Sequence, residues 1–419
     1  MRVQRNYNQP FFSNRRRGSN VRVILLLGAM IGGLLLLVVS QFNQLQSMAL
    51  DQIGLAPTTT PFASDLATRA LQAFTEGDLD TAIVLFEQAL EQQPENVNYL
   101  YEYGNILIEA DRDDEAVAIG DFAIQVEPND PRGYALKARA LMWTQQQDAI
   151  TAAIQGIEVD PNFGMLYAAQ GVAYTVLLRL DEGVRNAERA AQLEPMNPLV
   201  QRALYTPYLY VGRYQDAINA LNTAISLQPN LAAPMFELAF IYSLPQVGEP
   251  ELAIAIYNTI LVMEPENAKA NLRLCETYAR VDDADFRVAQ PYCDRALEID
   301  PDYGSAYRET GRMQYARRNY EGAIDSFEEC RDLGADDIEC WYLAGLSHYW
   351  LDECDDAWEI LLESQELAVA QQQPQQITDT IEDGLFFITE NCVGYTDQTR
   401  PTVPPPTPLP PTPIGGGFG

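Results

Sequence analysis

The sequence of 419 residues contains a single histidine, His348, and lacks the short motifs that usually mark a catalytic centre. It has no phosphate-binding loop, no G-x-S-x-G and no H-E-x-x-H. It has no C-x-x-C pair, and no cysteine lies at zinc-finger spacing from His348. These absences predict that the protein is not an enzyme, with no catalytic residue, no cofactor and no metal site.

Basic residues are also scarce, because 27 Lys and Arg face 59 Asp and Glu and leave a net charge of -32. An acidic chain repels phosphate groups, so nucleic acid is not an expected partner. Residues 1–50 have no Asp or Glu and six arginines, so a basic tip precedes an acidic body.

Charge is absent from residues 23–39, which form a run of seventeen apolar residues. Such a run reaches the lower limit for crossing ~30 Å of hydrocarbon. Arginines flank its N-terminal side, so the positive-inside rule predicts a cytoplasmic tail at 1–22 and a transmembrane signal-anchor helix at 23–40. The chain is then a single-pass cell-membrane protein with an extracytoplasmic body. A cleaved signal peptide is the alternative, because V-V-S and S-M-A offer cleavage sites.

Prolines recur along the body at intervals of 33 to 36 residues. A small residue lies ten positions after most of these prolines. A second small residue lies twelve positions before the next proline. Small residues at fixed places on two helical segments indicate two helices that cross closely, with proline ending the second helix. The spacing predicts an all-α solenoid of about nine helix-turn-helix units. The marks are Pro94, Pro128, Pro161, Pro195, Pro229, Pro265 and Pro301, and Ala335 takes the next place.

The pattern resembles the tetratricopeptide repeat (TPR) family over about three quarters of the chain. Tyr307, Gly311, Ala323 and Phe327 occupy the aromatic and small positions of its signature. The departures are Tyr205 in a small position, Gly120 in an aromatic position, and two-residue insertions around 245–250 and 281–285. Since both insertions fall between expected helices, they affect loop shape rather than the fold.

Composition divides the rest of the body into segments. A polar tether at 41–62 precedes the solenoid at 63–370, and a helix within 371–394 is expected to cap the stack. Residues 395–419 are rich in proline and are predicted to form a disordered tail. That tail could be a ligand for a partner, an attachment spacer or a glycosylated stalk.

Six cysteines lie in the last third of the chain, where an exported protein would oxidise them. Six cysteines allow fifteen connectivities. Their positions in the repeat favour the pairs Cys275–Cys293, Cys330–Cys340 and Cys354–Cys392. The alternative is that unpaired cysteine packs as a small apolar residue at tight helix crossings.

Resemblance to the family implies that the first helices of successive units line a concave groove that binds protein partners. The groove positions hold seven basic residues, Arg280 among them, against three acidic ones, Glu109, Glu276 and Glu339. Arginine and aromatic side chains suit an extended peptide, acidic or ending in a carboxylate. The alternative is that these aromatics belong to the core. The predicted partner-binding residues are Tyr101, Asn105, Arg132, Arg139, Trp143, Arg202, Tyr210, Phe236, Phe240, Lys269, Arg308, Arg312, Tyr315, Tyr342 and Tyr349.

These features predict a membrane-tethered scaffold that assembles proteins on the extracytoplasmic face. No small-molecule substrate is indicated. A passive surface spacer that acts through the proline-rich tail is the alternative.

Overall fold

The computed structural model describes residues 61–280, 286–334 and 337–395, and every regular element within them is an α-helix. The predicted cytoplasmic tail, the membrane segment, most of the tether and residues 396–419 lie outside the described part of the chain. Among the described helices, none combines the length and the apolar character that a membrane span requires. The predictions for the two ends of the chain therefore stay predictions.

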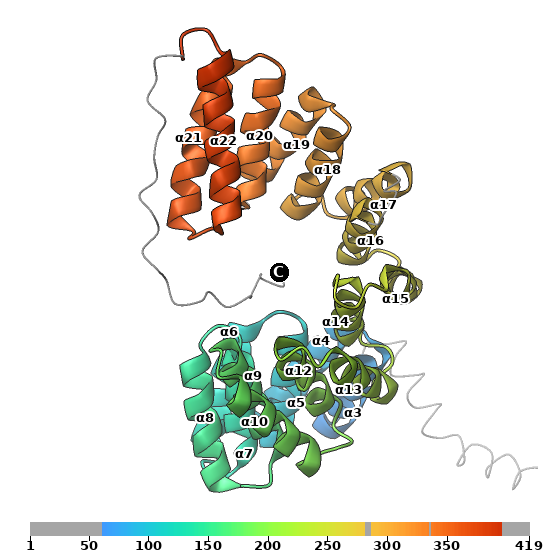
Figure 1. Cartoon of the computed structure of the whole chain (residues 1–419). Coiled ribbons are helices and arrows are strands. Elements are labelled where there is room, and N and C mark those ends of the chain that lie inside the picture. Colours follow the sequence, from blue (N-terminus) through green and yellow to red (C-terminus); the bar gives the residue numbers. More distant parts are fainter. Residues whose placement is uncertain (1–60, 281–285, 335–336, 396–419) are drawn as a thin grey trace, which may run out of the picture. The chain divides into compact units, whose positions relative to one another are not determined.

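Nine helix pairs follow one another along the described residues, and one further helix follows the last pair (Figure 1). In the fifth pair, α11 and α12 together take the place of the first helix. The helices of the first five pairs are α3 (Ala63–Glu76), α4 (Leu79–Gln92), α5 (Val97–Glu109), α6 (Asp113–Val126), α7 (Pro131–Leu141), α8 (Gln146–Val159), α9 (Gly164–Val176), α10 (Leu180–Leu193), α11 (Pro198–Ala203), α12 (Tyr205–Tyr210) and α13 (Tyr214–Leu227). Those of the last four pairs and the final helix are α14 (Ala232–Ser243), α15 (Pro250–Met263), α16 (Ala268–Arg280), α17 (Phe286–Ile299), α18 (Gly304–Ala316), α19 (Tyr320–Asp332), α20 (Ile338–Trp350), α21 (Cys354–Ala370) and α22 (Gln375–Asn391).

The recurring proline lies just beyond the end of a second helix. Helices α4, α6 and α8 each end two residues before their proline, because proline disfavours helical geometry in the residue that precedes it. An Asp or Asn then begins several of the first helices: Asn96 accepts a hydrogen bond from Tyr99 N, and Asp130 accepts one from Arg132 N. The short turn between units therefore follows from local sequence.

Small residues let the two helices of a pair approach closely. A Cβ atom added at Gly311 of α18 would lie 2.5 Å from the ring of Phe327 on α19, and that ring is fully buried. The core between helices consists largely of alanine, leucine and isoleucine side chains with no exposed surface. This is the packing that the repeated small positions predict.

The first helix of the fifth unit is broken where the repeat pattern fails. Tyr205, which replaces the usual small residue, is buried at the start of α12. Pro207 lies two residues later and has no N–H, so it cannot donate a helical hydrogen bond to the carbonyl of Ala203, the last residue of α11. The helix is interrupted at Leu204 and continues as α12.

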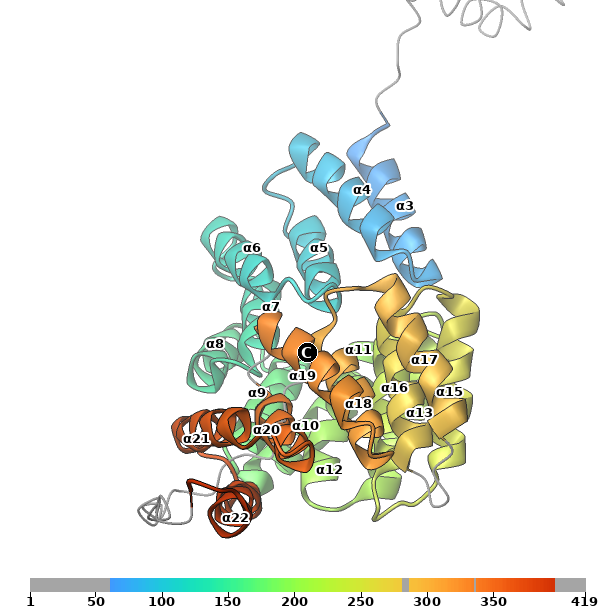
Figure 2. The same ribbon diagram turned by 90° about the horizontal axis from the view of Figure 1, so that it is seen from above.

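First helices of neighbouring units pack directly against one another, as α5 does with α7, α7 with α9, and α18 with α20. Second helices pack mainly against the first helix of their own unit and that of the next. We call the surface formed by successive first helices the first-helix face. Figure 2 shows the stack from a second direction.

Two turns that are far apart in sequence are joined by a hydrogen bond. Asn230, between α13 and α14, donates from Nδ2 to the carbonyl oxygen of Thr75 at 3.0 Å. The turn that follows α3 therefore meets the turn that precedes α14.

The six cysteines form the three pairs favoured by the repeat positions. Cys275 and Cys293 join α16 to α17, and Cys330 and Cys340 join α19 to α20. Cys354 at the start of α21 is bonded to Cys392, directly after α22. The last bond attaches the final helix to the ninth pair.

Candidate functional site

Four charged side chains from four helices meet on the N-terminal part of the first-helix face. Glu109 of α5 accepts hydrogen bonds from Arg139 of α7 and, at 2.7 Å, from Arg202 of α11. Arg202 also donates to Glu237 of α14 at 2.6 Å. We call Glu109, Arg139, Arg202 and Glu237 the N-terminal ion cluster. It connects first helices that are up to 128 positions apart in sequence and therefore ties several units together.

Burial and charge act in opposite directions on the two acids of this cluster. The side chain of Glu109 is 1% exposed, and burial alone would raise its pKa, but Arg202 and Arg139 hold that pKa below its ordinary value. Burial raises the pKa of Glu237, and Arg202 only partly opposes this change. Glu109 is therefore the acid whose charged form the cluster stabilises.

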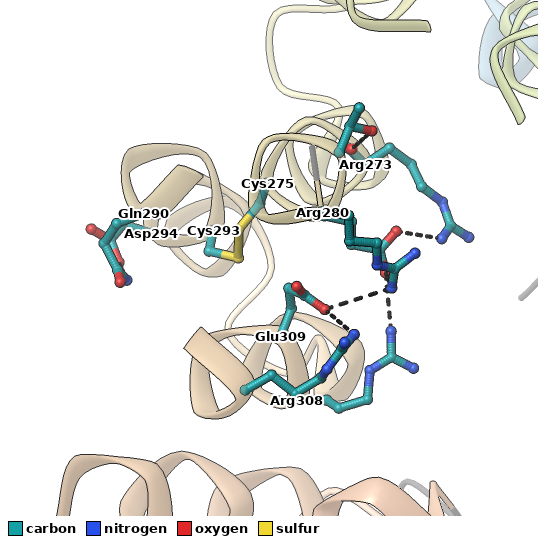
Figure 3. Close-up of a disulfide and its surroundings, with 11 residues drawn as sticks. Arg273, Cys275, Arg280, Gln290, Cys293, Asp294, Arg308 and Glu309 are labelled. Carbon is teal, nitrogen blue, oxygen red and sulfur yellow. Dashed lines mark hydrogen bonds and ion pairs between the residues drawn. A yellow bond between two sulfur atoms is a disulfide. The ribbon is translucent and has the colours of Figure 1, made fainter. Parts of the chain in front are cut away.

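A second group of ion pairs covers the C-terminal part of the same face. Arg308 of α18 bonds Asp337 at 2.5 Å and Glu276 of α16 at 3.0 Å. Arg312 bonds Glu309 at 3.0 Å. In Figure 3 the side chains of Arg280, Arg308 and Glu309 lie together to one side of the disulfide between Cys275 and Cys293. We call Arg280, Arg308, Arg312 and their acidic partners the C-terminal ion cluster; the partners are Glu276, Glu309, Asp337 and Glu339.

Most of the predicted groove arginines are thus paired within the chain. Arg139 is buried, and Arg132 is paired with Asp130. Three acids in these pairs were not among the predicted groove residues: Glu237, Glu309 and Asp337. Glu237 and Glu309 occupy the same place, the sixth residue of their first helices, so an acid repeated at that position was the available signal.

Lys269 of α16 differs from these arginines. Within the described residues, no carboxylate oxygen lies within ion-pair distance of its ammonium group. The Nζ atom lies 5.5 Å from the centre of the Phe236 ring on α14, and burial lowers the pKa of Lys269. Lys269 also lines an open hollow of about 880 Å³ together with Tyr303 and three acidic residues, Glu264, Glu266 and Asp300. It is a half-buried cation beside space that a ligand could fill.

The remaining predicted residues fall into three groups. Asn105 is buried and accepts a hydrogen bond from Arg139, and Tyr101 packs against Phe163. Trp143, Tyr210, Phe240 and Tyr342 are partly or substantially exposed; burial raises the pKa of Tyr342 to about 12. Tyr315 and Tyr349 belong to a cluster of aromatic rings at the C-terminal end of the stack. The structure therefore brings the predicted residues together in several separate groups, and only Phe236 and Lys269 among them combine a ring with a cation that has no carboxylate partner in the described residues.

The solitary histidine has a structural partner. His348 Nδ1 lies 2.6 Å from Glu353 Oε2, across the turn between α20 and α21. Asp356 lies close enough to offer a third ligand atom to a metal, but Glu353 and Asp356 are exposed surface acids. A hydrogen bond that closes the turn accounts for this arrangement.

Known proteins share both the repeat and the fold. Residues 73–140 and 276–338 match family models described as tetratricopeptide repeat. The human mitochondrial import receptor subunit TOM70 is 25% identical over 230 residues, which cover 51% of this chain and 36% of TOM70. The TPR repeat-containing protein YpiA of Bacillus subtilis (strain 168) is 22% identical over 321 residues, which cover 67% of this chain and 74% of YpiA. The chain thus spans about a third of TOM70 and most of YpiA.

A solved structure supports the same architecture. A chain of the APC/C hetero-tetramer Cut9-Hcn1 superposes with a TM-score of 0.56 at 16% sequence identity. The match covers 74% of the present chain and 59% of the other. At this identity the likeness concerns the fold alone.

Proposed function

We propose that this chain, which carries tetratricopeptide repeats in an all-helical solenoid, is a scaffold that binds a protein or peptide on its first-helix face. The observation that carries the proposal is the setting of Lys269. A half-buried cation without a carboxylate partner in the described residues costs desolvation energy, and an incoming carboxylate would offset that cost. The adjacent Phe236 ring offers apolar contact to the same ligand.

The ligand class follows from the cation and its surroundings. Lys269 has three N–H donors and no acceptor, so it selects acceptor groups such as a side-chain or terminal carboxylate. The ion-paired arginines on either side are engaged with Glu237 and Glu276. They bind the chain to itself, whereas a ligand carboxylate would form a new ion pair at Lys269. This gain must exceed the repulsion from Glu264, Glu266 and Asp300, which line the same hollow.

Replacement of Lys269 by methionine tests this role. Met keeps the apolar length of the side chain and removes the charge, so K269M should weaken binding of a carboxylate peptide at least tenfold, which corresponds to about 1.4 kcal/mol. Its midpoint of thermal unfolding should stay the same or rise, because a poorly solvated charge is removed. The probe is a pool of acidic peptides with a C-terminal carboxylate, measured by fluorescence anisotropy against the same pool as C-terminal amides.

Lys137 supplies the matched control. Lys137 and Lys269 are the only two lysines in the sequence, and Lys137 is paired with Asp121 at 2.7 Å. K137M should leave peptide affinity unchanged, and bound peptide should slow acetylation of Lys269 but not of Lys137. Equal affinity of the parent chain and K269M for every peptide in the pool would contradict the proposal. Charge reversal at Arg308 is a poorer test, because it would place a fourth acid beside Glu276, Asp337 and Glu339.

We further propose that the scaffold is tethered by residues 23–40 with its repeats on the extracytoplasmic face. Support comes from the uncharged run, the six arginines at the N-terminal end and the six cysteines in the body. A reporter fused after residue 419 should then be active only as a periplasmic or extracellular reporter, and the protein should fractionate with membranes. A reporter that is active in the cytosol would refute this orientation.

A further inference from the structure

Six aromatic rings form a continuous strip at the C-terminal end of the stack. Neighbouring ring centres lie 5.5 Å apart for Tyr315 and Tyr320, 6.0 Å for Tyr320 and Trp350, and 5.3 Å for Trp350 and Tyr349. Phe387 lies 6.2 Å from Tyr349, and Phe386 lies 6.3 Å from Phe387. We call these six residues the aromatic strip. It crosses α18, the start of α19, α20 and α22.

Much of the strip faces solvent. Trp350 is 54% exposed, Phe387 is 45% exposed and Phe386 is 41% exposed. Three exposed rings on α20 and α22 that continue into the partly buried rings of Tyr315, Tyr320 and Tyr349 are unusual on a protein surface and ordinarily mark an interaction site. The centre of the neighbouring core is made by fully buried residues such as Leu361 and Leu385. Tyr349 packs against this core from one side, and Tyr315 packs against the core around Phe327, so the exposed part of the strip is Trp350, Phe386 and Phe387.

The strip also has hydrogen-bond donors beside its rings. Trp350 Nε1 donates to the hydroxyl of Tyr315 at 3.2 Å, and Asn391 Nδ2 donates to the hydroxyl of Tyr349 at 3.1 Å. Each tyrosine hydroxyl accepts in these bonds, so its own hydrogen can be donated to a carbonyl of a ligand. Rings with adjacent hydroxyl donors are the chemistry that binds a polyproline II helix, whose backbone carbonyls have no internal partner.

The chain itself supplies a ligand of this kind. Residues 401–413 read P-T-V-P-P-P-T-P-L-P-P-T-P, and no charged residue occurs from 401 to 419. The last described residue, Tyr395, is held against α21 by a hydrogen bond to Asp355 at 2.8 Å and by packing against Trp358. Pro401 is six residues further on, which allows a reach of about 20 Å. Asn391, which contacts the strip, precedes Tyr395 by only four residues.

We propose that the aromatic strip is a docking site for the chain's own proline-rich segment, residues 401–413, bound in the same molecule. Proline rings pack on the exposed aromatic faces, and the carbonyls between them accept from the tyrosine hydroxyls. The entropy cost is small because proline restricts the segment before it binds. A tethered segment competes with external ligands at an effective concentration on the order of millimolar. The tail therefore covers the strip unless a tighter proline-rich partner displaces it.

A synthetic peptide of residues 401–413 tests the docking. Two proteins are compared by fluorescence anisotropy: the complete chain and the chain without residues 401–419. We expect the shortened chain to bind the peptide and the complete chain to bind it at least tenfold more weakly, because its own tail occupies the strip. A peptide with alanine in place of each proline should bind neither protein.

Variants of the shortened chain locate the site. W350A should reduce peptide affinity at least tenfold, and F387A should do so independently. F62A removes a phenylalanine that is 76% exposed directly before α3 and should have no effect. Since both strip residues are substantially exposed, the thermal midpoints of the variants should match the parent, which separates loss of binding from loss of folding.

Three results would overturn the proposal. The first is that the shortened chain does not bind the peptide or binds the alanine version equally well. The second is equal affinity of the complete and the shortened chain, which would assign the strip to a proline-rich segment of another protein. The third is a concentration-dependent dimer that disappears when the tail is deleted, which would place the tail on a second copy. All three are independent of the role of Lys269.

Discussion

The first six helix pairs and the last three are held together by different means. The N-terminal stack has no cysteine and is linked across units by a buried ion cluster in which the side chains of Glu109 and Arg139 are at most 4% exposed. The C-terminal stack has three disulfides, and its ion cluster is more open, with Arg312 33% exposed and Arg280 54% exposed. The comparison shows that one repeat can be stabilised between units either by buried charge or by covalent bonds.

The largest expected effect comes from loss of the disulfide that holds the final helix. Cys354 and Cys392 are 38 residues apart, so the C354S/C392S variant should lose about 4 kcal/mol of stability, mainly in the C-terminal stack. The Cys330–Cys340 disulfide closes a loop of only 10 residues, so the C330S/C340S variant should lose less stability, about 3 kcal/mol. Urea unfolding followed by hydrogen exchange measures both stacks, since units in a repeat array can unfold separately.

Reduction of the wild type extends the same comparison. A reductant should lower the unfolding midpoint of the C-terminal stack and leave the N-terminal stack unchanged, and mass spectrometry of the untreated protein should find all six cysteines oxidised. Six reactive thiols in the untreated protein would show that cysteine acts here as a small packing residue.

The next effect concerns the N-terminal ion cluster. E109Q removes the buried carboxylate that pairs with Arg139 and with one side of the Arg202 guanidinium. The variant should therefore lose about 3 kcal/mol of unfolding free energy. E237Q should cost less, about 1 kcal/mol, because burial already disfavours the charge of Glu237 and Arg202 keeps its bond to Glu109. R312A, in the open C-terminal cluster, should cost under about 1 kcal/mol. Equal losses for E109Q and R312A would show that burial does not distinguish the two clusters.

The dependence on pH has a definite sign. The pKa of Glu109 is lower in the folded chain than in the unfolded chain, so its contribution is fully present above the unfolded value of about 4.3. That contribution is lost as the pH falls through the folded value. The difference in unfolding free energy between wild type and E109Q should therefore be largest near neutral pH and shrink in acid. Glu237, whose pKa is raised, should show no such loss.

The fold was predictable because the repeat encodes it locally. Proline positions gave the helix ends, the small residues gave the close crossings, and the α14–α15 and α16–α17 connections absorb the two insertions. The break between α11 and α12 does not follow from the repeat pattern, in which Tyr205 is only a departure from the usual small residue. The break is caused by Pro207, which has no N–H group to continue the helical hydrogen bonds.

The candidate site was only partly predictable. Counting fixed positions found Lys269 and Phe236, which meet across two units. The same count misses Glu237 and Glu309, each of which directly follows a counted groove position. Glu237 forms an ion pair with Arg202, and Glu309 forms one with Arg312. An ion pair depends on side-chain reach between units, and a count along the sequence does not contain that distance.

By itself, therefore, the sequence determined the helix pairs, their order and the positions that could pair as disulfides, because each depends on spacing within or between adjacent units. Only the tertiary structure decided that the predicted groove arginines have carboxylate partners and that Lys269 has none within the described residues. Glu109 and Arg202 are 93 positions apart and meet only because the stack turns successive first helices toward one another. The exposed strip from Tyr315 to Phe387 likewise exists only once α18, α19, α20 and α22 have packed.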